Sequence, residues 1–105
     1  MIGQIPLAAV PSQNLQITLD GQDCRLAVYQ RERRLFMDLE CDGLTVFRGQ
    51  VCVNRTRLVQ SPTARFAGQL VFTDQEGDRP PHWRGLGSRW LLLYLSGPDL
   101  EEATA

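Results

Sequence analysis

The chain has 105 residues, 43% of them hydrophobic, and a formal net charge of −1 at pH 7. This length suits one domain with a modest core, and the hydrophobic content argues against intrinsic disorder. A charge near zero gives no overall attraction to nucleic acid or to an anionic membrane, and no apolar run approaches the roughly 20 residues of a membrane span.

All 11 basic residues are arginine, and the three cysteines, Cys24, Cys41 and Cys52, show no C-x-x-C spacing. Arginine suits polar protein–protein contacts because its planar guanidinium donates several hydrogen bonds, although a GC-rich genome would produce the same bias. The N-terminus lacks the basic and long apolar stretches of a secretory signal. We therefore expect reduced, buried cysteines in a protein made in a cytoplasm.

The first 12 residues are apolar but contain two prolines, Pro6 and Pro11, which supply no N–H group to a sheet. We predict an extended edge strand or arm over residues 1–12. Its apolar side chains, including Ile5 and Leu7, would cover either the chain's own core or a neighbouring subunit.

Residues 14–29 show the clearest strand pattern. Apolar side chains alternate with polar ones on both sides of Asp20-Gly21, a pair that tolerates the positive φ angles of a tight turn. The pattern predicts a β-hairpin with one apolar face. Because a lone hairpin is marginal in water, further strands and a second layer should follow.

A charged turn over residues 30–34 leads into a third predicted strand over 35–41. The apolar members of this strand share one face, whereas Phe36 lies among the acidic residues of the other face. We expect Phe36 to be covered by a loop or exposed for a partner. Asp42-Gly43 then repeats the turn chemistry, which predicts a second hairpin.

The meander continues with a strand over residues 44–53, in which Gly49 marks a bulge or bend. No regular pattern covers 54–68, where Leu58-Val59 is either a short strand or the anchor of a long loop.

The last part of the chain predicts a short strand over 69–73, a loop over 74–81 and a glycine-rich stretch over 82–87. The run 89–95 is apolar in both phases, which indicates a central strand or one at a subunit interface. Residues 98–105 read as a short flexible tail. The fold class is all-β: a single domain over 1–105, built as a small antiparallel β-sandwich or partly open barrel of six or seven strands.

No motif for catalysis or metal binding is evident. His82 stands alone beside Pro-Pro and Trp, which indicates a loop residue, and the dispersed cysteines do not give a zinc spacing. The acidic loop 74–78 lacks the residue order of a calcium loop. We therefore predict a protein that is not an enzyme, with no catalytic residue, metal or cofactor.

Two binding functions stay open as alternatives. A β-barrel can bind single-stranded nucleic acid through aromatic and basic side chains, here Arg25, Tyr29, Phe36 and Phe47, although the net charge disfavours it. A carbohydrate-binding module would use an exposed aromatic residue such as Trp83.

Several different short segments follow one another in a characteristic order along the chain. They are Ile5-Pro-Leu, Thr18-Leu-Asp-Gly-Gln22, Leu35-Phe-Met-Asp-Leu39, Asp42-Gly43, Gly68-Gln-Leu-Val-Phe72, Asp74-Gln-Glu-Gly-Asp78, Pro80-Pro81, Leu86-Gly-Ser-Arg89 and Leu93-Tyr94. Taken together over residues 5–95, this order resembles the small baseplate plug family of contractile-tailed bacteriophages. Residues 49–66 depart from the family pattern.

The resemblance implies a structural protein of the virion tail baseplate, made in the host cytoplasm and present in several symmetric copies. It would contact hub, spike, tail-tube or wedge proteins and its own copies, and would stabilise the assembly before contraction. No small-molecule substrate, nucleic acid or membrane is implied. Because aromatic and arginine residues dominate interfaces, the predicted interface residues are Ile5, Pro6, Leu7, Phe36, Arg55, Arg57, Arg79, Trp83 and Arg84.

Overall fold

The computed structural model describes residues 2–19, 21–59 and 68–95. These residues form the strands β1 (Ile2–Ile5), β2 (Ser12–Leu19), β3 (Gln22–Arg31), β4 (Arg34–Cys41), β5 (Leu44–Val51), β6 (Gln69–Asp74) and β7 (Trp90–Leu95), with one 3-10 turn, η1 (Trp83–Gly85). None of the described residues belongs to a helix long and apolar enough to cross a membrane.

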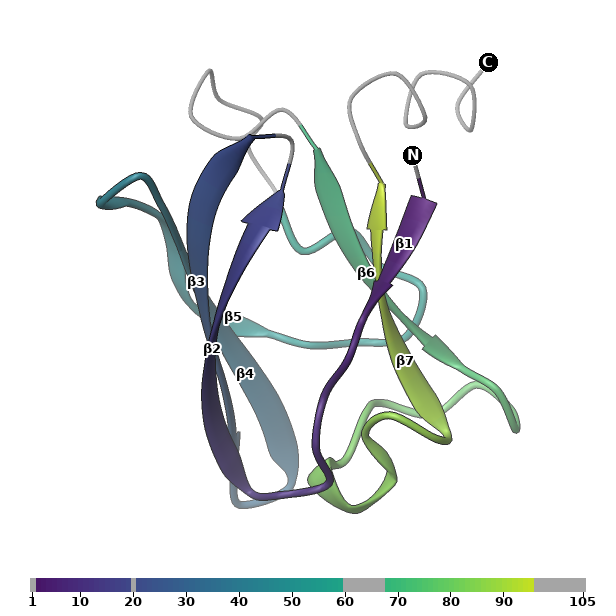
Figure 1. Cartoon of the computed structure of the whole chain (residues 1–105). Helices are drawn as coiled ribbons and strands as arrows, with labels where there is room; N and C mark the ends of the chain where they lie inside the picture. Colours follow the sequence, from purple (N-terminus) through teal and green to yellow (C-terminus); the bar gives the residue numbers. More distant parts are fainter. Residues whose placement is uncertain (1, 20, 60–67, 96–105) are drawn as a thin grey trace.

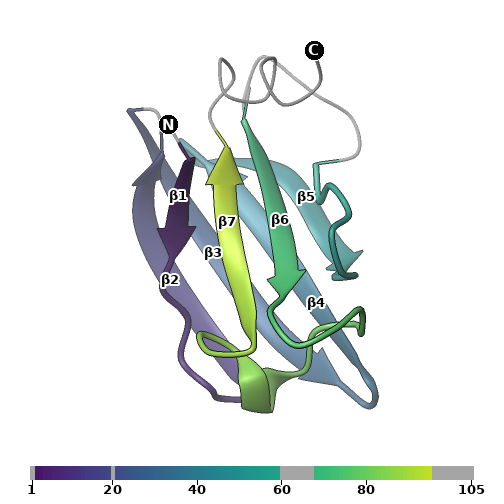
Figure 2. The same cartoon turned by 90° about the vertical axis from the view of Figure 1, so that its right-hand side faces the viewer.

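The strands form two antiparallel sheets that lie face to face (Figures 1 and 2). One sheet has three strands in the order β1-β7-β6, and the other has four in the order β2-β3-β4-β5. The sheets do not close into a barrel. The predicted all-β sandwich is therefore confirmed, with seven strands in the described residues, and the barrel alternative is not.

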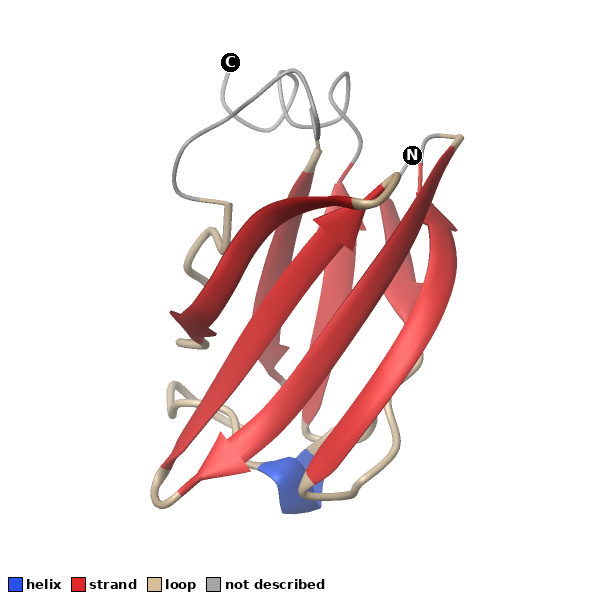
Figure 3. Cartoon of the chain, turned by 90° about the vertical axis from the view of Figure 1, so that its left-hand side faces the viewer, coloured by secondary structure: helices blue, strands red, loops and turns tan. Residues whose placement is uncertain are grey.

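The four-stranded sheet is the predicted meander, seen across the front of Figure 3. Hairpins join β2 to β3 and β4 to β5, and in both turns the glycine has a positive φ, 77° at Gly21 and 79° at Gly43. Gly49 lies in a bulge, since Met37 pairs with Gln50 while Leu39 pairs with Phe47. Two residues of β5 therefore oppose one of β4, as predicted.

The core lies between the sheets because apolar residues of alternating phase face inward from both. On β4 the inward set is fully buried, with exposures of 1% or less: Leu35, Met37, Leu39 and Cys41. The three-stranded sheet contributes Leu70, Phe72, Leu92 and Tyr94.

Strand β7 is the middle strand of its sheet, as predicted. Its burial nevertheless alternates: Leu92 faces the core, whereas Leu91, Leu93 and Leu95 are half-buried on the outer face. The position of β7 confirms the prediction of a central strand, and its half-buried outer face leaves the second alternative, a strand at a subunit interface, as a prediction.

The chain returns from β5 to the other sheet through residues 52–59, which lie along the edge of β6. Leu58 and Val59 are buried there. Leu58 donates its backbone N–H to the Leu70 carbonyl at 3.0 Å, and the Gln69 side chain bonds both the N–H and the carbonyl of Val59. Leu58 and Val59 therefore anchor a loop, which was one of the two alternatives predicted from the sequence. The predictions for residues 60–67 and the tail 98–105 lie outside the described residues.

Candidate protein-binding surfaces

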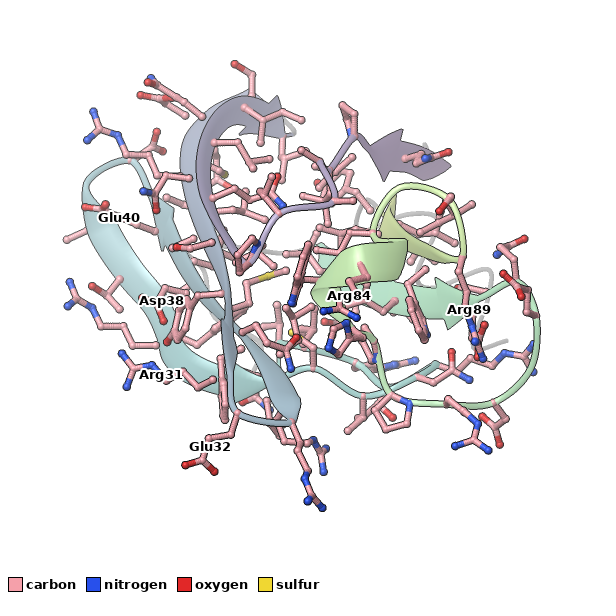
Figure 4. All side chains as sticks on the ribbon, turned by 90° about the horizontal axis from the view of Figure 1, so that it is seen from below. Arg31, Glu32, Asp38, Glu40, Arg84 and Arg89 are labelled. Atoms are coloured by element: carbon pink, nitrogen blue, oxygen red, sulfur yellow. The ribbon has the colours of Figure 1, made fainter. Side chains whose placement is uncertain are left out.

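The β3–β4 turn and η1 both lie at the lower end of the sandwich as drawn in Figure 1. Four exposed arginines, the basic end, gather on these two elements: Arg31, Arg33, Arg34 and Arg84. Figure 4 views the molecule from this side, with Arg31, Glu32 and Arg84 labelled. Four arginines and the exposed Glu32 give this end a formal charge of +3, in a chain whose net charge is −1.

The residues of the β3–β4 turn are not those that a tight turn usually prefers. Glu32 has a φ of 56°, in the left-handed region that favours glycine. Arg31 and Arg34 pair directly across the hairpin, where like charges destabilise a sheet. The turn therefore combines a left-handed backbone at Glu32 with two facing arginines at one exposed end of the sheet.

Next to this turn, Tyr29 and Phe36 stack on the outer face of the four-stranded sheet, with ring centroids 6.0 Å apart. The Arg31 guanidinium lies 5.1 Å from the Tyr29 ring centroid, close enough for a cation–π contact. Phe36 is therefore half-buried and stacks on a side chain of its own sheet.

The Tyr29 hydroxyl donates to Asp38 Oδ1 at 2.9 Å, and the Gly49 backbone N–H donates to the same oxygen at 2.7 Å. Desolvation, together with the hydrogen bond to Asp38, raises the pKa of Tyr29. The bulge at Gly49 thus holds the carboxylate that fixes the tyrosine, so Tyr29 and Phe36 present a fixed surface.

Trp83 occupies η1 and is half-buried against the core. Its ring centroid lies 5.8 Å from that of His82, and the Arg84 guanidinium lies 5.3 Å from the Trp83 ring. The Trp83 backbone N–H donates to Gln30 Oε1 at 3.3 Å, which joins η1 to β3. His82 caps the turn, since its Nδ1 accepts from the Arg84 N–H at 3.2 Å. His82 is therefore a loop residue, as predicted.

The loop that carries Trp83 is anchored by Asp74. The carboxylate accepts from Arg89 Nε at 2.9 Å and Arg89 Nη2 at 3.0 Å, and from the backbone N–H groups of Glu76 and Arg79. The Arg89 hydrogen bonds hold the pKa of Asp74 well below its usual range. Both carboxylate oxygens of Asp74 therefore already accept hydrogen bonds from protein donors.

A second surface is a hollow of about 590 Å³ on the outer face of the four-stranded sheet. Outward polar side chains from four strands line this sheet hollow: Asn14, Gln16, Arg25, Asp38, Glu40 and Arg48. Of its lining, sequence reasoning had named only Arg25 and Phe47, as candidates for binding nucleic acid. These polar side chains come together only because of the strand register, which places Arg25 opposite Gln16 of β2 and opposite Glu40 of β4.

The predicted interface residues do not form one site. Ile5 and Leu7 are buried in the chain's own core, with exposures of 2% and 9%, and only Pro6 between them is exposed. The segment therefore covers its own core, which was one of the two alternatives. In the isolated chain these two side chains therefore expose little or no surface.

The remaining predicted arginines lie apart from each other. Arg55 and Arg57 are exposed in the segment that borders β6, where Arg57 bridges Val71. Arg79 lies in the loop before η1, and its carbonyl accepts from Trp90 Nε1 at 3.1 Å. Only Trp83, Arg84 and Phe36 lie at or beside the basic end. The structure adds Arg31, Arg33 and Arg34, which the sequence had indicated merely as a charged turn.

Metal-binding groups are not assembled in the described ranges. No group of three His, Cys, Asp or Glu side chains there could hold a metal ion. Cys24, Cys41 and Cys52 are buried, as expected, and carry free thiols. The arrangement offers polar and aromatic surface for contact with another molecule.

A family model described as "Cyanophage baseplate Pam3 plug gp18" matches residues 2–98. A search of curated proteins finds no match to this chain.

Proposed function

Because the chain belongs to the cyanophage baseplate plug family, we propose that it is a structural component of a contractile phage tail baseplate. It is made in the host cytoplasm and incorporated into the virion in several copies. There it packs around the hub or spike and the tail tube, and stabilises the assembly before contraction. It acts by binding other proteins and catalyses no reaction.

The observation that carries this proposal is the family match, which extends over residues 2–98 of the 105. The fold is consistent with such a role. Two sheets with a continuous core make a rigid body, and the loop 75–89 is fixed to it at Asp74. A rigid surface loses little conformational entropy when it binds.

Within this proposal, the basic end is the main contact surface. It combines the positive charge of Arg31, Arg33, Arg34 and Arg84 with the fixed ring of Trp83. Arginine and tryptophan are the residue types most enriched in binding hot spots. Its partner would be an acidic surface on a neighbouring baseplate protein, since opposite potentials favour docking.

The experiment deletes the gene from a phage that carries it and supplies the protein from a plasmid. Electron microscopy then counts complete tails, and the titre counts infectious particles. Without complementation we expect tails that lack a stable baseplate, and the wild-type plasmid should restore them. Normal tails in the deletion phage would overturn the proposal.

Two matched charge reversals then test the surface. Arg84→Glu changes an exposed arginine of the basic end, whereas Arg48→Glu changes an exposed arginine of the sheet hollow. Neither side chain is buried, so both variants should fold. We expect a titre lower by about tenfold or more for Arg84→Glu, because reversing a charge at a contact surface weakens docking, and little change for Arg48→Glu. A larger loss of titre for Arg48→Glu than for Arg84→Glu would instead indicate that the sheet hollow is the contact surface.

Carbohydrate binding is a second candidate, favoured by the sheet hollow alone. Amide, carboxylate and guanidinium groups line it together with Phe47, a combination that could bind sugar hydroxyls and a sugar face. Nucleic acid fits less well because Asp38 and Glu40 offset Arg25 and Arg48. Calorimetric titration with oligosaccharides tests this function. Saturable binding that is lost in Gln16→Ala would support carbohydrate binding, and the absence of any heat of binding would contradict it.

A further inference from the structure

Cys24 and Cys41 occupy directly opposite positions on β3 and β4. Both side chains are buried, with exposures of 0% and 1%, and their Sγ atoms lie 2.8 Å apart. The third cysteine, Cys52, is equally buried but has a different neighbour, since its Sγ lies 3.9 Å from the Gln50 carbonyl oxygen. Two thiols that face each other this closely can be joined without moving other residues.

The backbone geometry of this pair suits a cross-link. The Asp42 backbone N–H donates to the Asp23 carbonyl at 2.9 Å, so Asp23 and Asp42 are a hydrogen-bonded pair. In an antiparallel ladder such pairs alternate with non-hydrogen-bonded ones, which makes Cys24 and Cys41 a non-hydrogen-bonded pair. Its Cα atoms are then about 4.5 Å apart, within the range that a disulfide spans.

We propose that Cys24 and Cys41 form an intramolecular disulfide when the protein meets a low-molecular-weight disulfide such as oxidised glutathione. One thiol attacks the small disulfide and releases one reduced glutathione. The second thiol attacks the resulting mixed disulfide and releases another. Two protein thiols are oxidised to one S–S bond, and one glutathione disulfide is reduced to two thiols.

The position of the pair explains how the reagent reaches it. Cys41 is the last residue of β4, and the Asp42-Gly43 turn follows it directly, so fraying of this hairpin end exposes both sulfurs. In the closed state, burial raises the pKa of both thiols and thiolate is scarce. Oxidation should therefore be slow in the native protein and faster in mild denaturant.

The chain is well suited to the test because it contains no lysine. Trypsin, which cuts after arginine, places Cys24 in peptide 1–25, Cys41 in peptide 35–48 and Cys52 in peptide 49–55. The purified full chain is incubated with oxidised glutathione, denatured, alkylated with N-ethylmaleimide and digested. We expect peptides 1–25 and 35–48 to be linked and to separate on reduction, while 49–55 carries one N-ethylmaleimide.

A matched variant and a stability measurement complete the experiment. Cys52→Ser should keep the cross-link, whereas Cys41→Ser should lose it. Closing the loop from Cys24 to Cys41 should raise the wild-type Tm by on the order of 10 °C, reversed by a reductant. Three alkylated cysteines after oxidation, a bridge through Cys52 or links only between chains would each overturn the proposal. It does not depend on the baseplate role.

Discussion

Asp74 and Arg89 form a two-point ion pair, with Oδ1 2.9 Å from Nε and Oδ2 3.0 Å from Nη2, across the base of the loop that carries Trp83. The Asp74 side chain is fully buried, whereas that of Arg89 is 27% exposed. Arg89 also lies over the Trp90 ring at 4.5 Å. One carboxylate therefore links the end of β6 to the loop and to the residue that precedes β7.

The first prediction concerns the pH dependence of stability. The pKa of Asp74 is lowered in the folded chain, so its stabilising effect is present above the ordinary aspartate value of about 4 and is lost as pH falls toward the lower folded value. Asp74→Asn should lower the Tm at pH 7, and the gap to wild type should narrow below about pH 4. Thermal melts from pH 7 to pH 2.5 measure this gap.

Glu76→Gln is the control for this pH prediction, because it removes a charge from the same loop but leaves the ion pair in place. Its Tm should follow wild type across the whole range. A gap for Asp74→Asn that stays constant with pH would contradict the assigned role of the carboxylate.

The second prediction concerns the contact between this loop and the N-terminal segment. Gly87 has a φ of 85°, and a Cβ added there would meet the Leu7 carbonyl oxygen at 2.5 Å. Gly87→Ala should lower the free energy of unfolding by about 1–2 kcal/mol from backbone strain alone, and more from displacement of Leu7. Gly3→Ala is the control, since no atom lies within 4 Å of its added Cβ. Urea denaturation compares them; equal stabilities would refute the contact.

The third prediction tests whether the N-terminal segment belongs to the chain's own core. Ile5→Ala removes a side chain that is 2% exposed and should destabilise the fold by about 2–4 kcal/mol. Pro6→Ala changes an exposed neighbour and should stay within about 0.5 kcal/mol of wild type. Urea denaturation of the isolated protein measures both. If Ile5→Ala hardly changed the free energy of unfolding, the N-terminal segment would be expected to pack against another subunit instead.

The four-stranded sheet could be predicted from the sequence almost completely. Alternating side chains identified β2, β3 and β4, and Asp42-Gly43 identified a turn, because both signals are local. Pairing between distant strands has no such signal. Nothing in residues 2–5 indicates that β1 pairs with β7, some 90 residues later, so the choice between own core and neighbour stayed open.

The candidate surfaces were harder to predict for the same reason. Trp83 and Arg84 could be selected by residue type, but the opposition of Arg31 and Arg34 appears only when the register is known. The sequence placed Asp74 in a loop and Arg89 at the start of a strand, and their spacing of 15 residues fits no local motif. Ile5 and Leu7 were selected as apolar residues of a terminal arm, and burial inside the chain removes them from its surface.

The last prediction separates stability from assembly at the basic end. Arg34→Glu replaces the repulsive Arg31–Arg34 pair with an attractive one, so the isolated domain should become more stable by roughly 0.5 kcal/mol. The same change lowers the charge of the proposed contact surface, so tail assembly should decrease.

The matched control is Arg25→Glu, which turns the attractive Arg25–Glu40 pair into a repulsive one. It should destabilise the domain by a similar amount and, once folded, support assembly. Thermal melts and complementation titres measured on both variants give the two readouts. A stabilised Arg34→Glu protein that assembles as well as wild type would show that the repulsion at this turn serves another purpose.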